Sequence, residues 1–323
     1  MNNNLFDFSI IIPHKNIPDL LKRCLSTIPQ RDDIQIIIVD DNSSPDIVDF
    51  DHFPGKNREN TTVIFNKEGK YAGHARNVAL DYAKGKWILF ADADDYYNYC
   101  FNDTLDEYKN DDSDIIFFKA NSVDTEYYTS SNRADDRLNL FIDCFEKDIE
   151  KYSNLLKYKC GEPWAKMIKK EIIDQYNIRF EETVIHNDHK FSYILGSHIH
   201  RLKVDKRAIY CVTTRKGSVQ TNNSDEAKLT RIRVFAEAEL FFLQNKLPSY
   251  VFWDKHFFQL GSLYYNNKDL YLEGVKLLFS LGFNKRNIIF RSYLYSYNSS
   301  INCYYKSLLR KFLYRTGIYK YKL

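Results

Sequence analysis

The first third of the chain alternates short runs of apolar and β-branched residues with segments of helical periodicity. Such runs are typical of parallel strands, which are buried on both faces, and they occur at 8–12, 34–39, 62–65, 87–91 and 114–118. Apolar residues recur at helical spacing over 20–28 and 75–83. We therefore predict a βαβαβαβ series, an α/β fold with a mostly parallel sheet flanked by helices.

After the fifth predicted strand, apolar runs and helical segments no longer alternate regularly. Residues 124–137 are polar and predict a loop, and residues 138–156 have a helical pattern. From about residue 224 the chain reads as mainly helical, with an apolar stripe formed by Ile232, Phe235, Ala236, Leu240 and Phe241. We predict a first domain over 1–220, with the sheet and the chemistry, and a mainly helical C-terminal region over 221–323.

The balance of charges limits which classes of binding partner are expected. The 46 Lys and Arg residues and 43 Asp and Glu residues give a net charge of +3, too balanced for a dedicated nucleic-acid binder. No acidic residue follows Glu273, whereas ten basic residues do. Residues 304–318 combine an apolar stripe with basic side chains, as in a helix lying on an anionic membrane surface. The alternative is a helix packed on the protein itself or on a partner subunit.

Cysteine usage and hydropathy indicate the compartment. The six cysteines are dispersed without a Cys-x-x-Cys pair, which argues against a disulfide framework and a zinc knuckle. The first residues lack a signal-peptide pattern, and no stretch approaches the ~18 apolar residues that a membrane span needs. We expect a cytoplasmic protein, either soluble or attached to the inner face of the cell membrane through the basic tail.

Candidate chemistry lies where the predicted strands end. In an α/β sheet, ligands bind beyond the carboxyl ends of the strands, and three ends are polar here: Pro13 to Asn16, Asp40 to Ser43, and Asp92 to Asp95. Carboxylates at such positions can hold Mg²⁺ or Mn²⁺ against a diphosphate. The alternative for the last group is an N-cap cluster for a helix near 99–108. A dinucleotide-dependent oxidoreductase is disfavoured, because the loop after the first strand has no glycine.

The order of these segments carries a specific resemblance. Residues 9–13, 38–43, 75–77, 83–88 and 92–95 read SIIIP, IVDDNS, ARN, AKGKWI and DADD, and together they resemble the ordered motifs of glycosyltransferase family 2. Trp164-Ala165-Lys166 is similar to the family's Trp-x-Lys segment, and Asn187-Asp188 stands where the family usually has Glu-Asp. The resemblance implies the GT-A fold and an inverting transferase that uses nucleotide-sugar donors.

Carried onto this sequence, the resemblance implies how the donor is bound. Asp41, with Asp40, would receive the uracil and ribose of a UDP-sugar, and Pro13 would belong to the same donor site. A carboxylate suits this role because it accepts hydrogen bonds from the uracil N3–H and ribose hydroxyls.

The resemblance also implies how the diphosphate is held. Arg76 would lie near the base or phosphates of the donor, and Asp92 near the ribose or the donor sugar. Asp94, with Asp92, would hold a Mn²⁺ or Mg²⁺ ion. A guanidinium and a divalent cation both offset diphosphate charge. For Arg76, the alternative is an ion pair with one of these same aspartates.

An inverting displacement needs a base to deprotonate the acceptor hydroxyl, and Asp188 is the candidate. It lies at the start of a predicted helix over 189–195, where the helix N-terminus stabilises a carboxylate. The alternative is an ordinary N-cap aspartate. The chain departs from the family at Asn187, which replaces an acidic residue. His186 and His189 flank the candidate base, each as a base, a phosphate partner or an exposed histidine.

Three further residues are candidates for the donor site. Trp164 offers an apolar face to a sugar ring, with core packing as the alternative. Lys166 is interpreted as a structural or phosphate contact. Arg215 lies in a Thr-Arg-Lys-Gly-Ser loop over 214–218, which resembles a family segment that folds over the donor diphosphate; the alternative is a solvated basic loop.

These features predict a metal-dependent inverting glycosyltransferase, of hexosyltransferase type. It would move a sugar from a UDP-sugar to a hydroxyl of a glycan or a lipid-linked glycan, as in capsule or lipopolysaccharide synthesis. One alternative is a sugar-phosphate nucleotidyltransferase, although that class carries a glycine-rich basic loop after its first strand. The other is a noncatalytic protein that binds nucleotide-sugars.

Overall fold

The computed structural model describes residues 6–125, 129–131, 135–214, 222–252 and 254–297. The chain forms two compact units. The first comprises Met1–Thr230 with Lys246–Val251, and the second comprises Arg231–Asn245 with Phe252–Leu323. The division at residue 220 stays a prediction about domains.

The first unit is built on one eight-stranded sheet with the order β3-β2-β1-β4-β7-β6-β8-β5. Neighbours β3, β2, β1 and β4 run parallel, as do β6 and β8, whereas β7 and β5 pair antiparallel with their neighbours. The predicted α/β class is therefore confirmed. The strands are β1 Phe6–His14, β2 Ile34–Asp41, β3 Thr61–Asn66, β4 Gly85–Phe90, β5 Tyr96–Tyr97, β6 Ile115–Asp124, β7 Lys166–Lys169 and β8 Leu202–Thr214.

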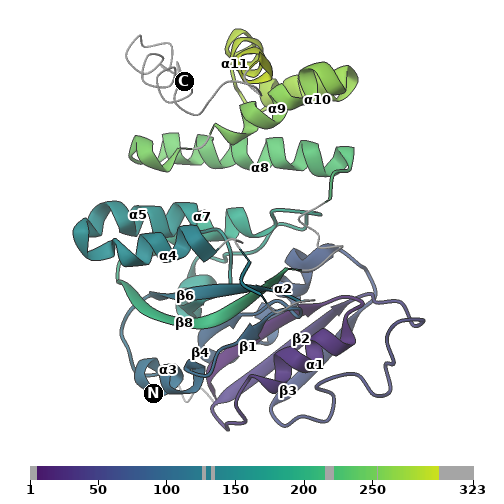
Figure 1. Ribbon diagram of the computed structural model, residues 1–323, viewed down its shortest axis with the longest axis vertical. Helices are drawn as coiled ribbons and strands as arrows, with labels where there is room; N and C mark the ends of the chain where they lie inside the picture. Colours follow the sequence, from purple (N-terminus) through teal and green to yellow (C-terminus); the bar gives the residue numbers. More distant parts are fainter. Residues whose placement is uncertain (1–5, 126–128, 132–134, 215–221, 253, 298–323) are drawn as a thin grey trace. The chain divides into compact units, whose positions relative to one another are not determined.

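Helices cover this sheet. Helix α2 packs on β1 and β2, and α4 packs on β6 and β8. Figure 1 shows α4, α5 and α7 together on one side of β6 and β8, with α3 on the other side. The helices of this unit are α1 Pro18–Ser26, α2 Tyr71–Tyr82, α3 Phe101–Tyr108, α4 Asp135–Asp143, α5 Ile149–Lys159, α6 Lys170–Gln175 and α7 Asp188–His198.

The core follows from the strand sequences. The apolar runs of β1, β2 and β4 are buried along almost their whole length, including Phe8, Ile10, Ile37 and Trp87 at 0% exposure. Strands buried on both faces favour continuous β-branched and aromatic residues, which is the pattern that predicted them. This rigid centre fixes the positions of the loops that follow each strand.

The predicted βαβαβαβ series is wrong at one step. Residues 42–60, all of which are described, form turns between β2 and β3 rather than a helix. Their many Asp, Asn, Ser, Pro and Gly residues favour turns. The segment is anchored by Phe53, which is buried and lies edge-on to the rings of His14 and Phe65. The helical pattern over 138–156 is likewise divided into α4 and α5 by a short 3-10 turn at Phe145–Lys147.

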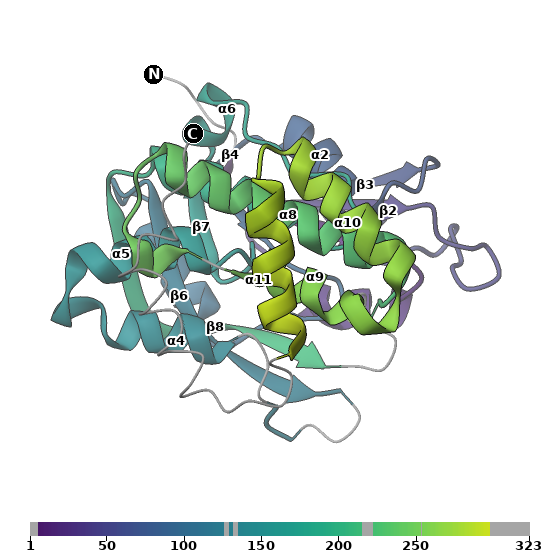
Figure 2. The same ribbon diagram turned by 90° about the horizontal axis from the view of Figure 1, so that it is seen from above.

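The second unit contains helices α9, α10 and α11, which pack against one another, and most of α8 (Figures 1 and 2). Leu260, Leu278 and Ile288 are fully buried, and Ile232, Phe235 and Ala236 of the predicted stripe are buried too. The helices are α8 Asp225–Gln244, α9 Lys255–Asn266, α10 Lys268–Ser280 and α11 Lys285–Tyr297.

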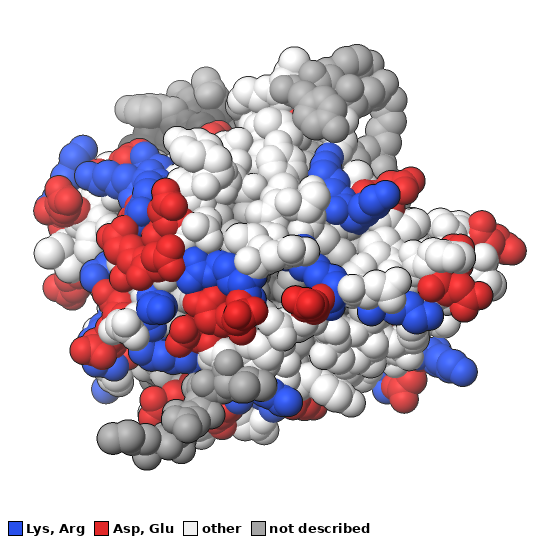
Figure 3. All heavy atoms as spheres, turned by 90° about the horizontal axis from the view of Figure 1, so that it is seen from below, with Lys and Arg blue, Asp and Glu red and all other residues white. Residues whose placement is uncertain are grey.

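Three observations concern the membrane and the surface charge. Among the described helices, none has both the length and the hydropathy to cross a bilayer. The basic tail at 304–318 lies outside the described residues. The molecular face in Figure 3 carries acidic and basic side chains next to one another.

Candidate functional site

The predicted strand ends share one edge of the sheet. Strands β2, β1 and β4 are adjacent and parallel, with Pro13 paired to Val39, His14 to Asp40, and Ile11 to Phe90. Because parallel neighbours end at the same edge, the segments after all three strands meet there. Pro13 itself is buried near the end of strand β1, close to the aspartates of β2.

Asp40 is held in a closed set of hydrogen bonds. Its carboxylate accepts from His14 Nδ1 at 2.7 Å, and from the backbone N–H and the hydroxyl of Ser43 at 2.9 and 2.5 Å. His14 Nε2 accepts from the Ile17 N–H, so the hydrogen of the ring lies on Nδ1. Burial alone would raise the pKa of Asp40, but these donors hold it below its usual range. Asp40 therefore orders the loops after β1 and β2.

Asp41 differs from its neighbour. Its Oδ2 accepts the backbone N–H of Tyr71 at 3.0 Å and lies 3.4 Å from Lys15 Nζ. Its Oδ1 is buried and has no hydrogen-bond partner among the described residues. An unsatisfied buried carboxylate oxygen is costly unless a ligand supplies the donor. Asp41 thus combines a tie to the start of α2 with one oxygen in need of a donor.

Arg76 links two segments that are far apart in sequence. This α2 residue is 5% exposed, and its Nη2 pairs with Asp92 Oδ1 at 2.6 Å. Its Nη1 donates to Asn187 Oδ1 at 2.9 Å. The ion pair with an aspartate, left open by the sequence, is therefore present. The guanidinium brings the segment after β4 next to the start of α7, where Asp188 lies.

The segment after β4 is a tight turn. The Asp95 N–H donates to the Asp92 carbonyl at 3.0 Å, and the side chains of Asp92 and Asp94 are partly exposed. Asp95 is buried and accepts from Thr213 N–H and the Tyr210 hydroxyl at 2.7 and 3.0 Å. Burial raises its pKa well above the usual range, and the negative charges of Asp94 and Asp92 add to this shift.

The alternative that made this turn an N-cap cluster is wrong. Helix α3 begins at Phe101, and its N-cap residue is Cys100. The Asp95 carboxylate is engaged by β8 instead. The acidic turn is thus anchored to the sheet rather than to the helix that follows it.

Asp188 is the first residue of α7, as predicted. Asn187 is the N-cap residue and makes no side-chain cap, because its oxygen accepts from Arg76. Burial raises the pKa of Asp188 above its usual range, while the charges of Arg76 and His186 oppose that shift. Such a carboxylate is a stronger proton acceptor than an exposed one.

Two histidines flank Asp188. The rings of His186 and His189 lie 5.0 Å apart in a T-shaped arrangement. One ligand atom from each histidine and from Asp188 lie within 4.8 Å of one another, a set that could hold a metal ion or share a proton. His186 has a φ of 53°, an unusual conformation for a residue other than glycine.

Trp164 and Lys166 have structural contacts. Trp164 is 5% exposed and stacks on Tyr210 with ring centroids 5.6 Å apart, which is the core-packing alternative. Lys166 is 4% exposed, and its Nζ donates to the carbonyl oxygens of Cys160 and Glu162. Burial lowers the pKa of this ammonium group. Arg215 lies outside the described residues.

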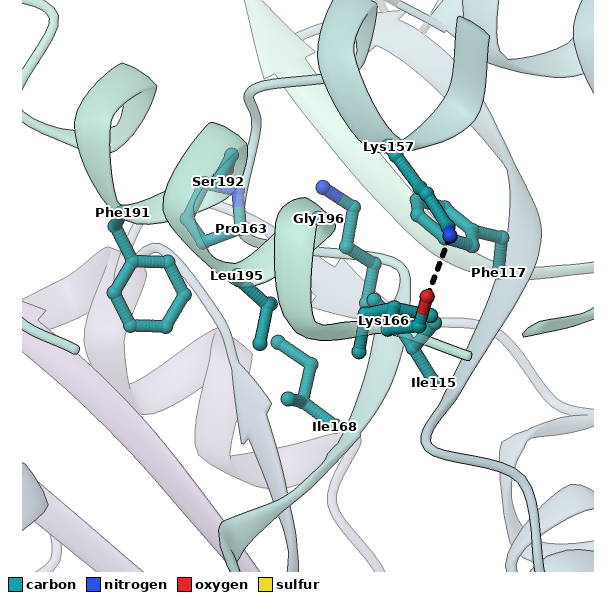
Figure 4. Close-up of a pocket in the computed structure, with 11 residues that line it drawn as sticks. Ile115, Phe117, Lys157, Pro163, Lys166, Ile168, Phe191, Ser192, Leu195 and Gly196 are labelled. Atoms are coloured by element: carbon teal, nitrogen blue, oxygen red, sulfur yellow. Dashed lines mark hydrogen bonds between the residues drawn. The ribbon is translucent and has the colours of Figure 1, made fainter. Parts of the chain in front are cut away.

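Lys166 also lines a small pocket (Figure 4). The walls are mostly apolar, and Lys157 enters from α5 with its Nζ donating to the Ile199 carbonyl. None of the candidate aspartates lines this pocket. It is therefore separate from the acidic edge of the sheet.

Two contributors to the site were not predicted. Gly73 of α2 lies so close to the loop before α7 that a Cβ there would be 1.9 Å from the Glu181 carbonyl oxygen and 2.9 Å from Asn187 Cβ. A glycine inside a helical pattern usually has a packing reason, which is the signal that could have found it. Tyr210 is the second contributor, because its hydroxyl holds the acidic turn. It lies 118 residues after Asp92, so no local sequence pattern could have connected the two residues.

The fold and this edge define an α/β protein with polar side chains gathered beyond the carboxyl ends of its parallel strands, and similarity to known proteins identifies the family. The family model described as "Glycosyl transferase family 2" matches residues 9–176, more than half of the chain. The chain belongs to glycosyltransferase family 2. The predicted family and the enzyme class, glycosyltransferase, are therefore confirmed.

Curated relatives match parts of the chain. It is 40% identical over 95 residues to the poly(ribitol-phosphate) beta-glucosyltransferase of Bacillus spizizenii, covering 27% of this chain and 15% of that protein. It is 28% identical over 225 residues to the minor teichoic acid biosynthesis protein GgaB of Bacillus subtilis, covering 65% of this chain and 23% of that protein. The matches thus span less than a quarter of either relative.

A solved structure shares the fold. Staphylococcus aureus TarS residues 1–349, in complex with UDP-GlcNAc, superposes with a TM-score of 0.62 at 18% identity, covering 84% of this chain and 79% of that one. The predicted GT-A fold is confirmed by this likeness.

Proposed function

We propose that this protein transfers a sugar from a UDP-sugar, with inversion and with a divalent cation, to a hydroxyl of a glycan or lipid-linked glycan in surface polysaccharide synthesis. Relatives named for poly(ribitol-phosphate) glucosylation and teichoic acid synthesis support a cell-surface polymer as acceptor. The UDP-GlcNAc complex of TarS supports a uridine nucleotide donor.

The observation that carries the proposal is the bridge made by Arg76. One guanidinium contacts both Asp92, after β4, and Asn187, beside the candidate base. Transfer requires the donor diphosphate and the acceptor base to lie on either side of the reacting carbon. The bridge places a positive charge and the two acidic segments within one small region, as this chemistry needs.

The polar edge of the sheet has a hydrogen-bond acceptor that could bind the uracil base. The buried Oδ1 of Asp41 lacks a donor among the described residues. The uracil N3–H is a donor that a carboxylate accepts. Asp40 would then act indirectly, by holding the loop that carries Asp41, since its own oxygens are engaged by His14 and Ser43.

Asp92 and Asp94 suit a hard divalent cation. Both offer carboxylate oxygens, the ligands that Mg²⁺ and Mn²⁺ take, and both side chains are partly exposed at the turn. Asp95 does not join them, because β8 engages its carboxylate. When bound, such an ion supplies positive charge next to the donor diphosphate.

Asp188 would take the acceptor proton. The acceptor oxygen forms the new bond to the anomeric carbon as the bond from that carbon to the diphosphate oxygen breaks. The hydroxyl proton passes to the Asp188 carboxylate, and Arg76 stabilises the diphosphate as it leaves. Attack from the face opposite the leaving group inverts the anomeric carbon.

The test is Asp188→Asn, assayed with a panel of UDP-sugars and polyol-phosphate or glycan acceptors. Loss of a general base lowers turnover about 10²- to 10⁴-fold, while UDP still raises the melting temperature as in the wild type. Asp103→Asn is the matched control, since Asp103 is an exposed acid in the first turn of α3. Unchanged turnover in Asp188→Asn would remove this residue from the mechanism.

The same panel separates the alternatives. Pyrophosphate release from UTP and a sugar phosphate would instead identify a nucleotidyltransferase. Tight UDP binding without any transfer or slow UDP-sugar hydrolysis would identify a noncatalytic binding protein. Membership of glycosyltransferase family 2 favours transfer over both.

A further inference from the structure

The turn that carries Asp92 and Asp94 is tied to the end of β8. The Asp92 N–H donates to the Tyr210 hydroxyl oxygen at 2.8 Å, and the Tyr210 hydroxyl donates to Asp95 Oδ2 at 3.0 Å. Thr213 donates its N–H to Asp95 Oδ1 at 2.7 Å and its hydroxyl to the Asp94 carbonyl at 2.6 Å. Every residue of the turn except Ala93 is thus held from β8.

The Tyr210 ring is buried and packed between two other aromatic rings, which hold its hydroxyl in place. The side chain is fully buried, stacked on Trp164 and edge-on to Tyr97, with ring centroids 5.6 and 5.4 Å away. Tyr97 also pairs with Tyr210 in the antiparallel ladder of β5 and β8. Trp164 therefore contributes to the site by supporting this ring rather than by presenting a face to a sugar.

Asp95 completes the arrangement from the other side. It is 2% exposed and receives one hydrogen bond on each carboxylate oxygen from β8. Both oxygens are used, so this aspartate serves as the anchor of the turn. Asp92 and Asp94 are therefore carried on a turn whose backbone is hydrogen-bonded to β8 at both residues.

We propose that Tyr210 is a positioning residue, whose phenol fixes the backbone of the Asp92–Asp95 turn so that the Asp92 and Asp94 carboxylates can bind a cation and diphosphate together. This rests on the proposed function, since it concerns the same donor site. The role is indirect: Tyr210 touches the turn and not the donor.

The test compares Tyr210→Phe with Tyr97→Phe in the 323-residue chain. Tyr210→Phe removes the hydroxyl and keeps the ring packing. Tyr97→Phe is the matched control, because its buried hydroxyl has no hydrogen-bond partner among the described residues and it belongs to the same aromatic cluster. Binding of UDP in a Mn²⁺ titration is followed by calorimetry, and the KM for the donor and kcat are measured separately.

Tyr210→Phe should raise the half-saturating Mn²⁺ concentration and the donor KM about tenfold, the usual range for losing a buried hydrogen bond. The acceptor KM of Tyr210→Phe should stay unchanged. In Tyr97→Phe, the half-saturating Mn²⁺ concentration, the donor KM and the acceptor KM should all match those of the wild type. If Tyr210→Phe does not fold, Thr213→Val removes the bond to the Asp94 carbonyl and should weaken Mn²⁺-dependent UDP binding in the same direction.

Two failures are distinguishable. If wild-type protein binds UDP with Mn²⁺ and Tyr210→Phe matches Tyr97→Phe in every constant, the positioning role is overturned while the proposed function stands. If wild-type protein shows neither metal-dependent UDP binding nor transfer, the proposed function fails, and the positioning role fails with it.

Discussion

Replacing Arg76 with lysine tests the bridge on which the site depends. The guanidinium uses two different nitrogens, Nη2 toward Asp92 and Nη1 toward Asn187, at 2.6 and 2.9 Å. A lysine keeps the positive charge but presents it as a single point, so it can serve one acceptor and not both. The variant therefore isolates the shape of the bridge from its charge.

The expected loss follows from the two contacts. Each hydrogen bond to a charged group contributes about 1.5–3 kcal/mol, and Arg76→Lys removes one of the two. The Asp92 side chain is 34% exposed, so water compensates for part of the loss there, whereas Arg76 itself is 5% exposed. We expect kcat/KM to fall about 10- to 100-fold, the equivalent of roughly 1.4–2.7 kcal/mol.

The assay is steady-state transfer from the preferred UDP-sugar, with UDP binding measured in parallel. Arg179→Lys is the control, because Arg179 likewise pairs with an aspartate, Asp81, but at the surface and at 3.2 Å. Surface pairs contribute little, so this change should leave kcat/KM within about twofold. If Arg76→Lys transfers sugar as well as Arg179→Lys, the bridge does not organise the site.

Three further changes probe separate parts of the site. Asp94→Ala should abolish the increase in UDP binding that Mn²⁺ produces, and a retained Mn²⁺ response in the thermal-shift assay would exclude it as a ligand. In a pH profile, kcat/KM should fall on acidification, because Asp188 must be ionised to act as a base. Burial raises the pKa of Asp188, so the midpoint should lie above 3.8, the ordinary pKa of an aspartate; a midpoint at 3.8 or below would contradict this. Gly73→Ala should destabilise the protein by about 1–3 kcal/mol in urea unfolding, because its Cβ would overlap the Glu181 carbonyl; Gly161→Ala, whose Cβ would make only ordinary contact at 3.6 Å, should be tolerated.

Local sequence pattern predicted the parallel half of the sheet well. The runs that became β1, β2 and β4 are buried on both faces, and burial of that kind leaves a continuous apolar signal. The polar residues after these strands were placed for the same reason, because each apolar run ends where a polar residue follows. The start of α7 at Asp188 was instead expected from the helical pattern over 189–195 and from the family resemblance.

In the other half of the sheet, β6 was predicted from such a run at 114–118, but β7, β8 and β5 were not. Strand β7 has four residues, and β8 begins with partly exposed residues before its buried end. Their positions depend on pairing with β6, which is set by residues distant in sequence. The bridge from Arg76 to Asn187, 111 residues apart, is invisible locally for the same reason.

Two pairs of neighbouring aspartates look alike in the sequence, but in the structure the two members of each pair have different roles. In the first, Asp40 is fully engaged by His14, 26 residues away, and Ser43, whereas Asp41 has a buried oxygen in need of a donor. In the turn after β4, Asp95 is engaged by Thr213, 118 residues away, whereas the side chain of Asp94 is partly exposed. Each segment thus has one carboxylate that shapes the loop and another at the candidate site. Residue type and spacing are the same for both roles, so only the partners supplied by the fold can distinguish an anchor from a ligand.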